Sequence, residues 1–364
     1  MIKTFKIVVL GGDGIGPEVT DQAVRLLREM EPYLSGVKFD LAEHRVGVGE
    51  YQRSGNALPE STFEACRTSD AVLLGAMGLP NVRYPNGKEI APQLDLRERL
   101  QLFGGIRPIR LYHESDTPLK GYGKDEIDFV LVRESTEGLF YGRDVVADLD
   151  ADEAINELRI SRVGAERVCR LAFDLARKRN KAKKVSLIDK ANVLSSMVYF
   201  RHIFDQVAKD YPDITPEHVY VDAASLFMVR KPDAFDVMVT ENMFGDILSD
   251  LAAGLVGGMG MAPSADIGED AAVFQPSHGS APDIAGQGIA NPIAMILSAA
   301  MMLEWLDHTE THRAAVALET AVSEVLSDPS HRTPDMGGKM STTQLTDAVS
   351  SSLQKILDSQ QLNA

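Results

Sequence analysis

The chain has 364 residues, and we expect two lobes because single hydrophobic cores stop growing near about 250–300 residues. The formal net charge of −16 argues against a nucleic-acid partner, since phosphate backbones repel an acidic surface, but local arginines can still bind an anionic substrate. The two cysteines, Cys66 and Cys169, have no metal-type spacing and form no disulfide framework, which fits a reducing cytosol.

The apolar runs predict neither export nor membrane insertion. Residues 7–10 are too few for the apolar region of a signal peptide, because the run stops at Gly11. The longest later run, residues 293–303, falls short of the roughly 20 residues that cross a bilayer. The sequence therefore predicts a cytoplasmic protein with no membrane partner.

In chain order, short β-rich apolar runs alternate with segments of helical apolar spacing. The predicted strands lie at residues 7–10, 71–74, 129–132, 185–188 and 237–240. The predicted helices lie at residues 18–30, 165–179, 198–210 and 293–306. Continuous apolar strands separated by helices indicate an α/β fold in which the strands are buried on both faces.

The first glycine-rich turn does not have the spacing of a dinucleotide-binding fingerprint. Counted from Gly11, Asp13 occupies the position of the second glycine; counted from Gly12, Pro17 replaces the third. We interpret this segment as a turn between a strand and a helix, with Pro17 near the helix start. A cofactor site is expected elsewhere.

Two carboxylates and a lysine suggest a metal-assisted site. Asp246 and Asp250 are four residues apart, so a helix places both on one face, where Mg²⁺ or Mn²⁺ would offset their repulsion. A solvated acidic face is the alternative. Lys190 follows the predicted strand at residues 185–188, and Asp222 follows residues 219–221, which also indicate a strand end. A lysine in a cleft can act as a base, and a surface position is the alternative for both residues.

Three arginines stand in apolar or glycine contexts: Arg97, Arg107 and Arg133. Guanidinium groups bind carboxylates through two parallel hydrogen bonds, so three of them suit a diacid or triacid, although each alone also fits a structural salt bridge. The small-residue loop that begins at His278 allows a cofactor to approach the backbone closely, or is simply a turn.

Together these segments resemble the 3-isopropylmalate/isocitrate dehydrogenase family over about residues 5–355. The later motifs are closer to the 3-isopropylmalate members. The motifs that carry the resemblance are Gly11, Gly12, Gly14, Gly16, Pro17, Glu18, Arg97, Arg107, Arg133, Glu134 and residues 189–193, 244–250 and 278–286.

The resemblance implies a two-domain, non-Rossmann α/β fold with a large mixed sheet flanked by helices. Residues 1–102 and 257–364 would form a cofactor-binding domain from both chain ends. Residues 103–256 would form a central domain for substrate, metal and dimerisation. A homodimer with a shared active site is also implied.

The resemblance also assigns roles. Arg97, Arg107 and Arg133 would hold substrate carboxylates, and Asp246 and Asp250 would bind Mg²⁺ or Mn²⁺ with Asp222 of a second subunit. Lys190 of that subunit, together with Asp222, would remove a proton from the substrate. The implied cofactor-binding residues are His278, Gly279, Ser280, Ala281, Asp283, Ile284 and Asn291. Asp283 stands where NADP-dependent isocitrate dehydrogenases carry a lysine, which implies NAD.

The implied reaction is oxidation and decarboxylation of a small anionic hydroxy-diacid, a 3-substituted malate, with 3-isopropylmalate as the first candidate. D-malate, tartrate and isocitrate are alternatives, and a non-catalytic paralogue is the alternative class. Phe140 replaces the tyrosine that donates a proton in the family, so we expect that Tyr141, water or Lys190 donates it or that the final step differs. Gln93 and Leu94 replace an apolar pair that faces the substituent, which favours a smaller or more polar group.

Overall fold

A ten-stranded mixed sheet forms the frame of the computed structural model, which describes residues 2–145 and 148–362. The strand order is β2-β1-β3-β10-β9-β4-β5-β8-β6-β7. The strands are β1 (Lys3–Gly12), β2 (Val37–Glu43), β3 (Ala71–Ala76), β4 (Gly104–Arg110), β5 (Asp128–Glu134), β6 (Lys184–Asp189), β7 (Thr215–Tyr220), β8 (Val237–Thr240), β9 (Pro263–Ile267) and β10 (Ala272–Pro276). The predicted α/β class with a mixed sheet is confirmed, because antiparallel pairs (β10·β9, β9·β4, β4·β5) interrupt parallel ones.

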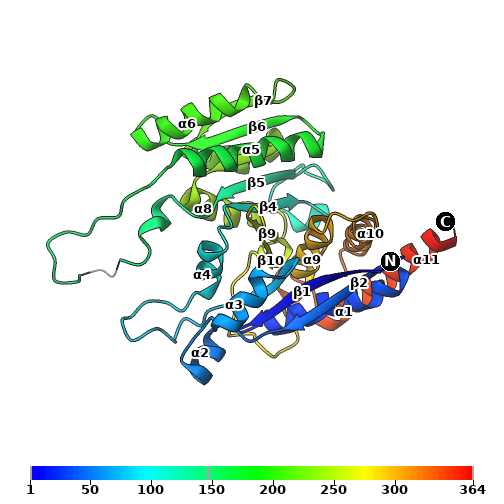
Figure 1. Cartoon of the computed structure of the whole chain (residues 1–364). Coiled ribbons are helices and arrows are strands. Elements are labelled where there is room, and N and C mark those ends of the chain that lie inside the picture. The colour runs from blue at the N-terminus through cyan, green and yellow to red at the C-terminus, as the bar shows by residue number, and fades with distance from the viewer. Residues whose placement is uncertain (1, 146–147, 363–364) are drawn as a thin grey trace.

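Helices lie on both faces of this sheet (Figure 1). They are α1 (Gly16–Met30), α2 (Val48–Ser54), α3 (Glu60–Arg67), α4 (Pro92–Arg99), α5 (Arg162–Arg179), α6 (Ser195–Ala208), α7 (Val221–Arg230), α8 (Asn242–Gly254), α9 (Ile293–Trp305), α10 (Thr309–Leu326) and α11 (Thr342–Leu362). The strands β2, β1, β3, β10 and β9 come from the two ends of the chain, and the other five come from its middle. The proposed domain division falls between β9 and β4 in this order, and it stays a prediction.

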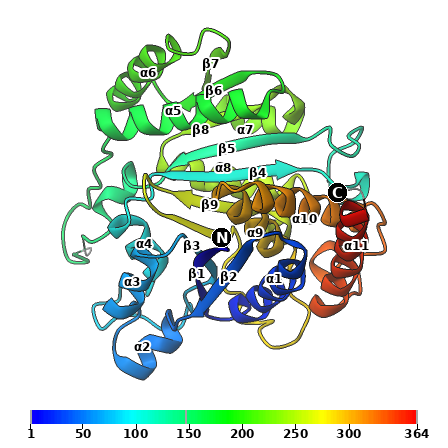
Figure 2. The same cartoon turned by 45° about the vertical axis from the view of Figure 1, so that its right-hand side comes forward.

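Alternation along each strand separates two core layers. In β1, Ile7 and Val9 pack toward α1 and α9, whereas Val8 and Leu10 pack toward α3 and α4. In β5, Val130 faces α5 and Leu131 faces α8. We call the side of α1, α5 and α9 the back face and the side of α4 and α8 the front face. In Figure 2, α5 and α9 lie on the near side of β4 and β5.

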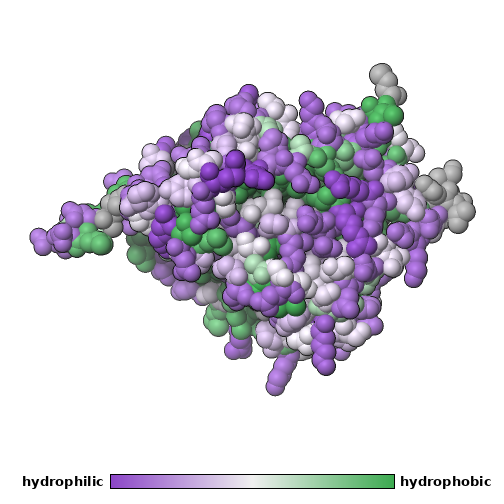
Figure 3. Space-filling model, turned by 90° about the horizontal axis from the view of Figure 1, so that it is seen from below, coloured by the Kyte–Doolittle hydropathy of each residue, from purple (hydrophilic) through white to green (hydrophobic). Residues whose placement is uncertain are grey.

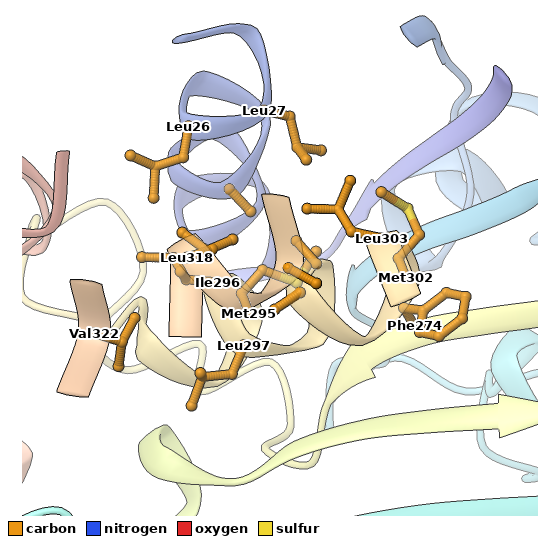
Figure 4. Packing of buried hydrophobic residues seen from close by; sticks show 14 of the residues in the cluster. Leu26, Leu27, Phe274, Met295, Ile296, Leu297, Met302, Leu303, Leu318 and Val322 are labelled. Carbon is orange, nitrogen blue, oxygen red and sulfur yellow. The ribbon is translucent and has the colours of Figure 1, made fainter. Parts of the chain in front are cut away.

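The apolar run at residues 293–303 is the centre of the largest core cluster. Met295, Ile296 and Leu303 of α9 pack among leucines of α1 and of α10, such as Leu27 and Leu318 (Figure 4). Because helices and strands surround α9, nearly every one of its positions is buried and the run needs no polar face.

Hydrophilic residues cover most of the molecular face in Figure 3, and hydrophobic residues form small separate groups there. Such a distribution is typical of a surface in contact with water. Among the described residues, no helix has the length and apolar character that a bilayer crossing requires.

Candidate active site

Three buried arginines meet in one hollow of about 270 Å³ on the front face. Arg97 comes from α4, Arg107 from β4 and Arg133 from the neighbouring strand β5. The other predicted residues in the lining are Gln93, Leu94, Asp246, Asp250, His278 and Gly279. Residues more than 180 positions apart in the chain therefore share one concave surface.

A buried aspartate that sequence reasoning missed holds two of the arginines. The Asp266 carboxylate accepts from Arg97 Nη2 at 3.0 Å and from Arg107 Nη2 at 3.4 Å, and Gln275 Nε2 donates to it at 2.7 Å. Burial alone would raise the pKa of Asp266, but the attraction of Arg97 and Arg107 outweighs it and holds the pKa at about 2. Asp266 is therefore ionised and serves as the internal counter-ion of the cluster.

Arg133 is fixed by α8. Its Nε donates to Asn242 Oδ1 at 2.8 Å, and its Nη1 forms an ion pair with Asp246. Burial and the neighbouring Arg97 lower the pKa of Arg133 to about 10, and Asp246 offsets part of this effect. Gly245 makes the approach possible, because a Cβ atom there would lie 2.7 Å from Arg133 Cβ.

The two carboxylates of α8 lie one helical turn apart, as predicted. Glu241 caps the start of this helix by accepting from Met243 N at 3.1 Å and Phe244 N at 2.7 Å. Burial and the like charge of Asp246 raise the pKa of the Asp250 carboxyl. Such a pair fits the oxygen-donor chemistry of Mg²⁺ or Mn²⁺. Within residues 2–145 and 148–362, no group of three or more His, Cys, Asp or Glu side chains is placed to hold a metal ion.

Lys190 and Asp222 do not line the hollow. Lys190 follows β6, and its Nζ lies 2.5 Å from Asp222 Oδ1, which lowers the pKa of Asp222. Asp222 was expected directly after a strand that ends at residue 221. In the structure β7 ends at Tyr220, and Asp222 lies in the first turn of α7. The pair is accessible at the surface of the chain.

Phe140, rather than Tyr141, faces the hollow. Phe140 is part of the lining, and its ring lies 5.2 Å from the Arg133 guanidinium carbon. The Tyr141 side chain is 53% exposed and lies under the Arg159 guanidinium at 4.4 Å, outside the hollow. The structure thus separates these neighbouring aromatic residues into two environments.

The predicted cofactor loop packs against the first glycine-rich turn. The Ser280 carbonyl accepts from Ile15 N at 2.8 Å, and the Ser280 hydroxyl donates to the Gly78 carbonyl. Gly14 has a φ of +59°, and a Cβ atom there would meet Ser280 O at 1.9 Å, so the turn requires glycine for close packing. Asp13 ties this turn down by accepting from backbone amides of Val48, Gly49 and Gly78.

The remaining cofactor-loop residues divide into exposed and buried ones. Asp283 is exposed, and Ala281 and Ile284 are half-buried. Asn291 is buried: its Oδ1 accepts from Ile293 N at 3.1 Å, and its Nδ2 donates to Asp335 Oδ2 at 3.2 Å. The side chain of Asn291 therefore organises the start of α9.

Four polar atoms of the lining are buried without a hydrogen-bond partner among the described residues: Arg97 Nε, Gln93 Oε1, Ser277 Oγ and His278 Nε2. Unpaired buried polar atoms cost free energy and are uncommon in folded proteins. Burial lowers the pKa of His278, which favours the neutral ring. The hollow is therefore suited to a polar, anionic ligand that supplies the missing partners.

Comparison with known proteins agrees with this geometry. A sequence profile described as isocitrate/isopropylmalate dehydrogenase matches residues 6–349. The chain is 41% identical to 3-isopropylmalate dehydrogenase of Aquifex aeolicus (98% of this chain, 99% of that protein), and 44% identical to the Moorella thermoacetica enzyme of the same name (91% and 93%). The solved isocitrate dehydrogenase of Methylococcus capsulatus superposes with a TM-score of 0.86 at 38% identity (96% and 99%). A β-decarboxylating dehydrogenase of Thermococcus kodakarensis superposes at 0.80 with 36% identity (97% of each chain).

The mixed sheet and the arginine-lined hollow thus define a β-decarboxylating dehydrogenase. The chain belongs to the isocitrate/isopropylmalate dehydrogenase family.

Proposed function

We propose that the chain catalyses the NAD- and Mg²⁺- or Mn²⁺-dependent oxidative decarboxylation of a 3-substituted malate, with 3-isopropylmalate as the first candidate. The observation that carries the proposal is the meeting of Arg97, Arg107 and Arg133 with the α8 carboxylates and His278 in one hollow. Relatives that are 41% and 44% identical bear the name 3-isopropylmalate dehydrogenase, which supports this substrate.

The arginines would bind the substrate carboxylates through charge-assisted hydrogen bonds, with Arg97 Nε free to donate. Asp246 and Asp250 would hold the metal ion, which when bound stabilises negative charge on the substrate hydroxyl oxygen. Lys190 would take the proton from that hydroxyl, and its ion pair with Asp222 holds the amine in place. Oxidation at this carbon makes the product a β-keto acid, which then loses CO₂.

NAD would bind along the loop that starts at His278 and accept hydride from the substrate. Gly279 has open space where a Cβ atom would stand, so its backbone is accessible to a ligand. The exposed Asp283 can accept hydrogen bonds from ribose hydroxyls and would repel a 2′-phosphate, which favours NAD over NADP.

A homodimer would complete the site, because Lys190 and Asp222 lie outside the hollow of their own chain. Among the described residues, fifteen large hydrophobic side chains are exposed, and eight of them lie between Val193 and Ile247, including Leu226 of α7 and Met243 of α8. A second copy that covered this apolar surface would bring its own Lys190 and Asp222 to the α8 carboxylates.

A substrate with a smaller, more polar substituent, such as D-malate, tartrate or an isocitrate-type acid, is the second candidate. Its support is Gln93, whose Oε1 lies buried without a partner beside Leu94 in the lining. An isopropyl group cannot donate to this oxygen, whereas a hydroxyl group can.

The test is NADH formation from a panel of 3-substituted malates with Mn²⁺, repeated after addition of EDTA. We expect turnover of 3-isopropylmalate or a near analogue, lost with EDTA. Turnover of a polar-substituted malate alone would favour the second candidate. Substrate binding without NAD⁺ reduction on any compound would indicate a non-catalytic paralogue, for which Phe140 is the sequence support.

A further inference from the structure

A second cavity, of about 540 Å³, lies on the back face behind the candidate active site. The two spaces share strands: Ile106 and Arg107 are neighbours in β4, Ala265 and Asp266 in β9, and the first of each pair lines the back cavity. Because side chains alternate across a sheet, a single layer of backbone separates the two spaces. Nothing in the proposed reaction uses the back cavity.

The cavity lies between the two back-face core clusters. Leu171 and Leu175 of α5 form one wall, and Leu297, Met301 and Trp305 of α9 form the other. At the rim, Lys178 Nζ and Glu304 Oε1 join the two helices at 2.9 Å. A volume of a few hundred Å³ with apolar walls is typical of sites for small organic ligands. The charged side chains of the lining are Arg110, Asp128, Lys178, Arg179, Lys181, Glu304 and Glu319.

The charges around this cavity leave one carboxylate without a partner. Arg110 Nε pairs with Asp125 at 2.6 Å, Lys178 pairs with Glu304, and Arg179 and Lys181 pair with Asp128. Half-buried Glu319 of α10 forms no hydrogen bond or ion pair with any described residue. Burial raises the pKa of Glu319, the nearby Glu304 raises it further, and Arg110 offsets part of the effect.

We propose that the back cavity binds a small amphiphilic cation, with its apolar or aromatic body between α5 and α9 and its ammonium group on Glu319. The apolar walls would bury the body, as Leu171 and Trp305 face it from opposite sides. The ammonium would supply the ion-pair partner that Glu319 lacks among the described residues. An anion of the same shape should bind more weakly because the Glu319 carboxylate repels it. A neutral analogue should also bind more weakly because it forms no ion pair with Glu319.

Trp305 gives a direct readout, because it is the chain's single tryptophan and lines the cavity. We would titrate the full chain at pH 7.5 with 2-phenylethylammonium and follow tryptophan fluorescence, with 2-phenylethanol and phenylacetate as neutral and anionic controls of similar size. We expect saturable binding of the cation and affinity about tenfold or more weaker for both controls.

Glu319→Gln should weaken cation binding by about tenfold or more, and the matched control Glu324→Gln, on the exposed side of the same helix, should bind within about twofold of the wild type. If Glu319→Gln does not fold, titrations of the wild type at several pH values still test the proposal. Lowering the pH through the Glu319 pKa must weaken the binding of 2-phenylethylammonium and leave the binding of 2-phenylethanol unchanged. No saturable signal, equal affinity for all three compounds, or a pH-independent cation affinity overturns the proposal.

Discussion

At the scale of single residues, the front hollow depends on a balance of buried charge. Arg97, Arg107 and Arg133 are each less than a tenth exposed, and Asp266 lies between the first two. An unpaired buried charge costs far more free energy than a paired one. Asp266 therefore allows the guanidinium groups to stay buried and charged in the hollow before a ligand binds. The low pKa of Asp266 shows that the arginines favour the ionised form of its carboxyl group.

Asp266→Asn should lower the free energy of unfolding by about 2–4 kcal/mol at neutral pH, since it leaves buried guanidinium groups without their counter-ion. The folded-state pKa of about 2 lies below the usual value of 3.8, so the carboxylate stabilises the fold above pH 3.8 and this contribution disappears as the pH falls toward 2. The shift corresponds to about 2 kcal/mol.

Urea unfolding of the wild type and of Asp266→Asn at several pH values measures the difference in their free energies of unfolding. The difference between the two proteins should be largest near pH 7 and narrow below about pH 4. Asp40→Asn, at an exposed position, should stay within about 0.5 kcal/mol of the wild type. A wild-type advantage that grew on acidification would refute the assigned role of Asp266.

Phe140→Tyr should raise the rate of NADH formation wherever protonation of the enol limits turnover, because a general acid contributes about 10²–10⁴-fold. Hydride transfer should be retained in the wild type, because phenylalanine at this position removes a proton donor and leaves the arginines and the α8 carboxylates in the hollow. Tyr141→Phe is the matched variant. Since Tyr141 lies outside the hollow under Arg159, we expect its rate to stay within about twofold of the wild type.

Equal rates for Phe140→Tyr and the wild type would mean that another group already supplies the proton. A large loss in Tyr141→Phe would identify that group as Tyr141 after a rearrangement. Steady-state kinetics with the best substrate of the panel separates these outcomes.

Sequence reasoning found the arginines and the α8 carboxylates because each is a charge in an apolar context. It missed Asp266, although this residue stands between Ala265 and Ile267. Asp266 reaches the arginines only because β9 pairs with β4, some 160 residues away in the chain. Gln275 was missed for the same reason, because its role is the hydrogen bond that its Nε2 donates to Asp266 at 2.7 Å.

At the scale of elements, α8 organises the front of the sheet. Glu241 caps it, Gly245 lets it contact β5, and the following two turns present Asp246 and Asp250 toward the hollow. For α8, the sequence argument was only that a helix would place Asp246 and Asp250 on one face, whereas α9 was predicted from its long apolar run, which is a local signal. The central strand β4 was not, because Pro108 argues against a strand interior and only its neighbours β5 and β9 enforce the extended form.

Because α8 places two like charges in one turn, Mn²⁺ should raise the melting temperature of the wild type, and EDTA should reverse the rise. A ligand at about 100 times its Kd stabilises the folded state by about 2.7 kcal/mol, which is a shift of a few degrees for a chain of this size. Asp250→Asn should abolish most of the shift. Asp270→Asn, at an exposed position outside the hollow, should keep it. An equal shift in both variants would contradict metal binding by α8.

At the scale of the whole molecule, one continuous sheet carries strands from both chain ends and from the middle, so the hollow forms only when distant segments assemble. The sequence resemblance predicted this wrapping, and local patterns did not, because they carry no information on strand order. Lys190 and Asp222, to which we assign proton transfer and the third metal carboxylate in the proposed function, do not line the hollow of their own chain. Asp222 lies in α7, which also carries the exposed Leu226 and Val229. In the proposed homodimer, each chain therefore contributes Lys190 and Asp222 to one site, as its donor side, and its own hollow to the other site, as its acceptor side.

This separation predicts complementation between inactive variants. Lys190→Ala removes the proton-transfer group from the donor side, and Asp246→Asn removes a metal carboxylate from the acceptor side. A homodimer of either variant should therefore be inactive. In a mixed dimer, the intact hollow of the first chain meets the intact Lys190 of the second. Random reassortment of equal amounts should therefore restore about a quarter of the wild-type NADH formation, since half of the dimers are mixed and each has one complete site of two.

The matched control pairs Asp246→Asn with Arg97→Ala. Both changes damage the acceptor side of their own chain, so every hollow in the mixture keeps a defect and activity should stay at background. Recovery in the Lys190→Ala mixture but not in this control requires a site built from two chains. If the Lys190→Ala mixture also stayed at background while size-exclusion chromatography with distinguishable tags showed mixed dimers, Lys190 would have to act within its own chain. It would then have to reach the hollow through a movement that separates it from Asp222.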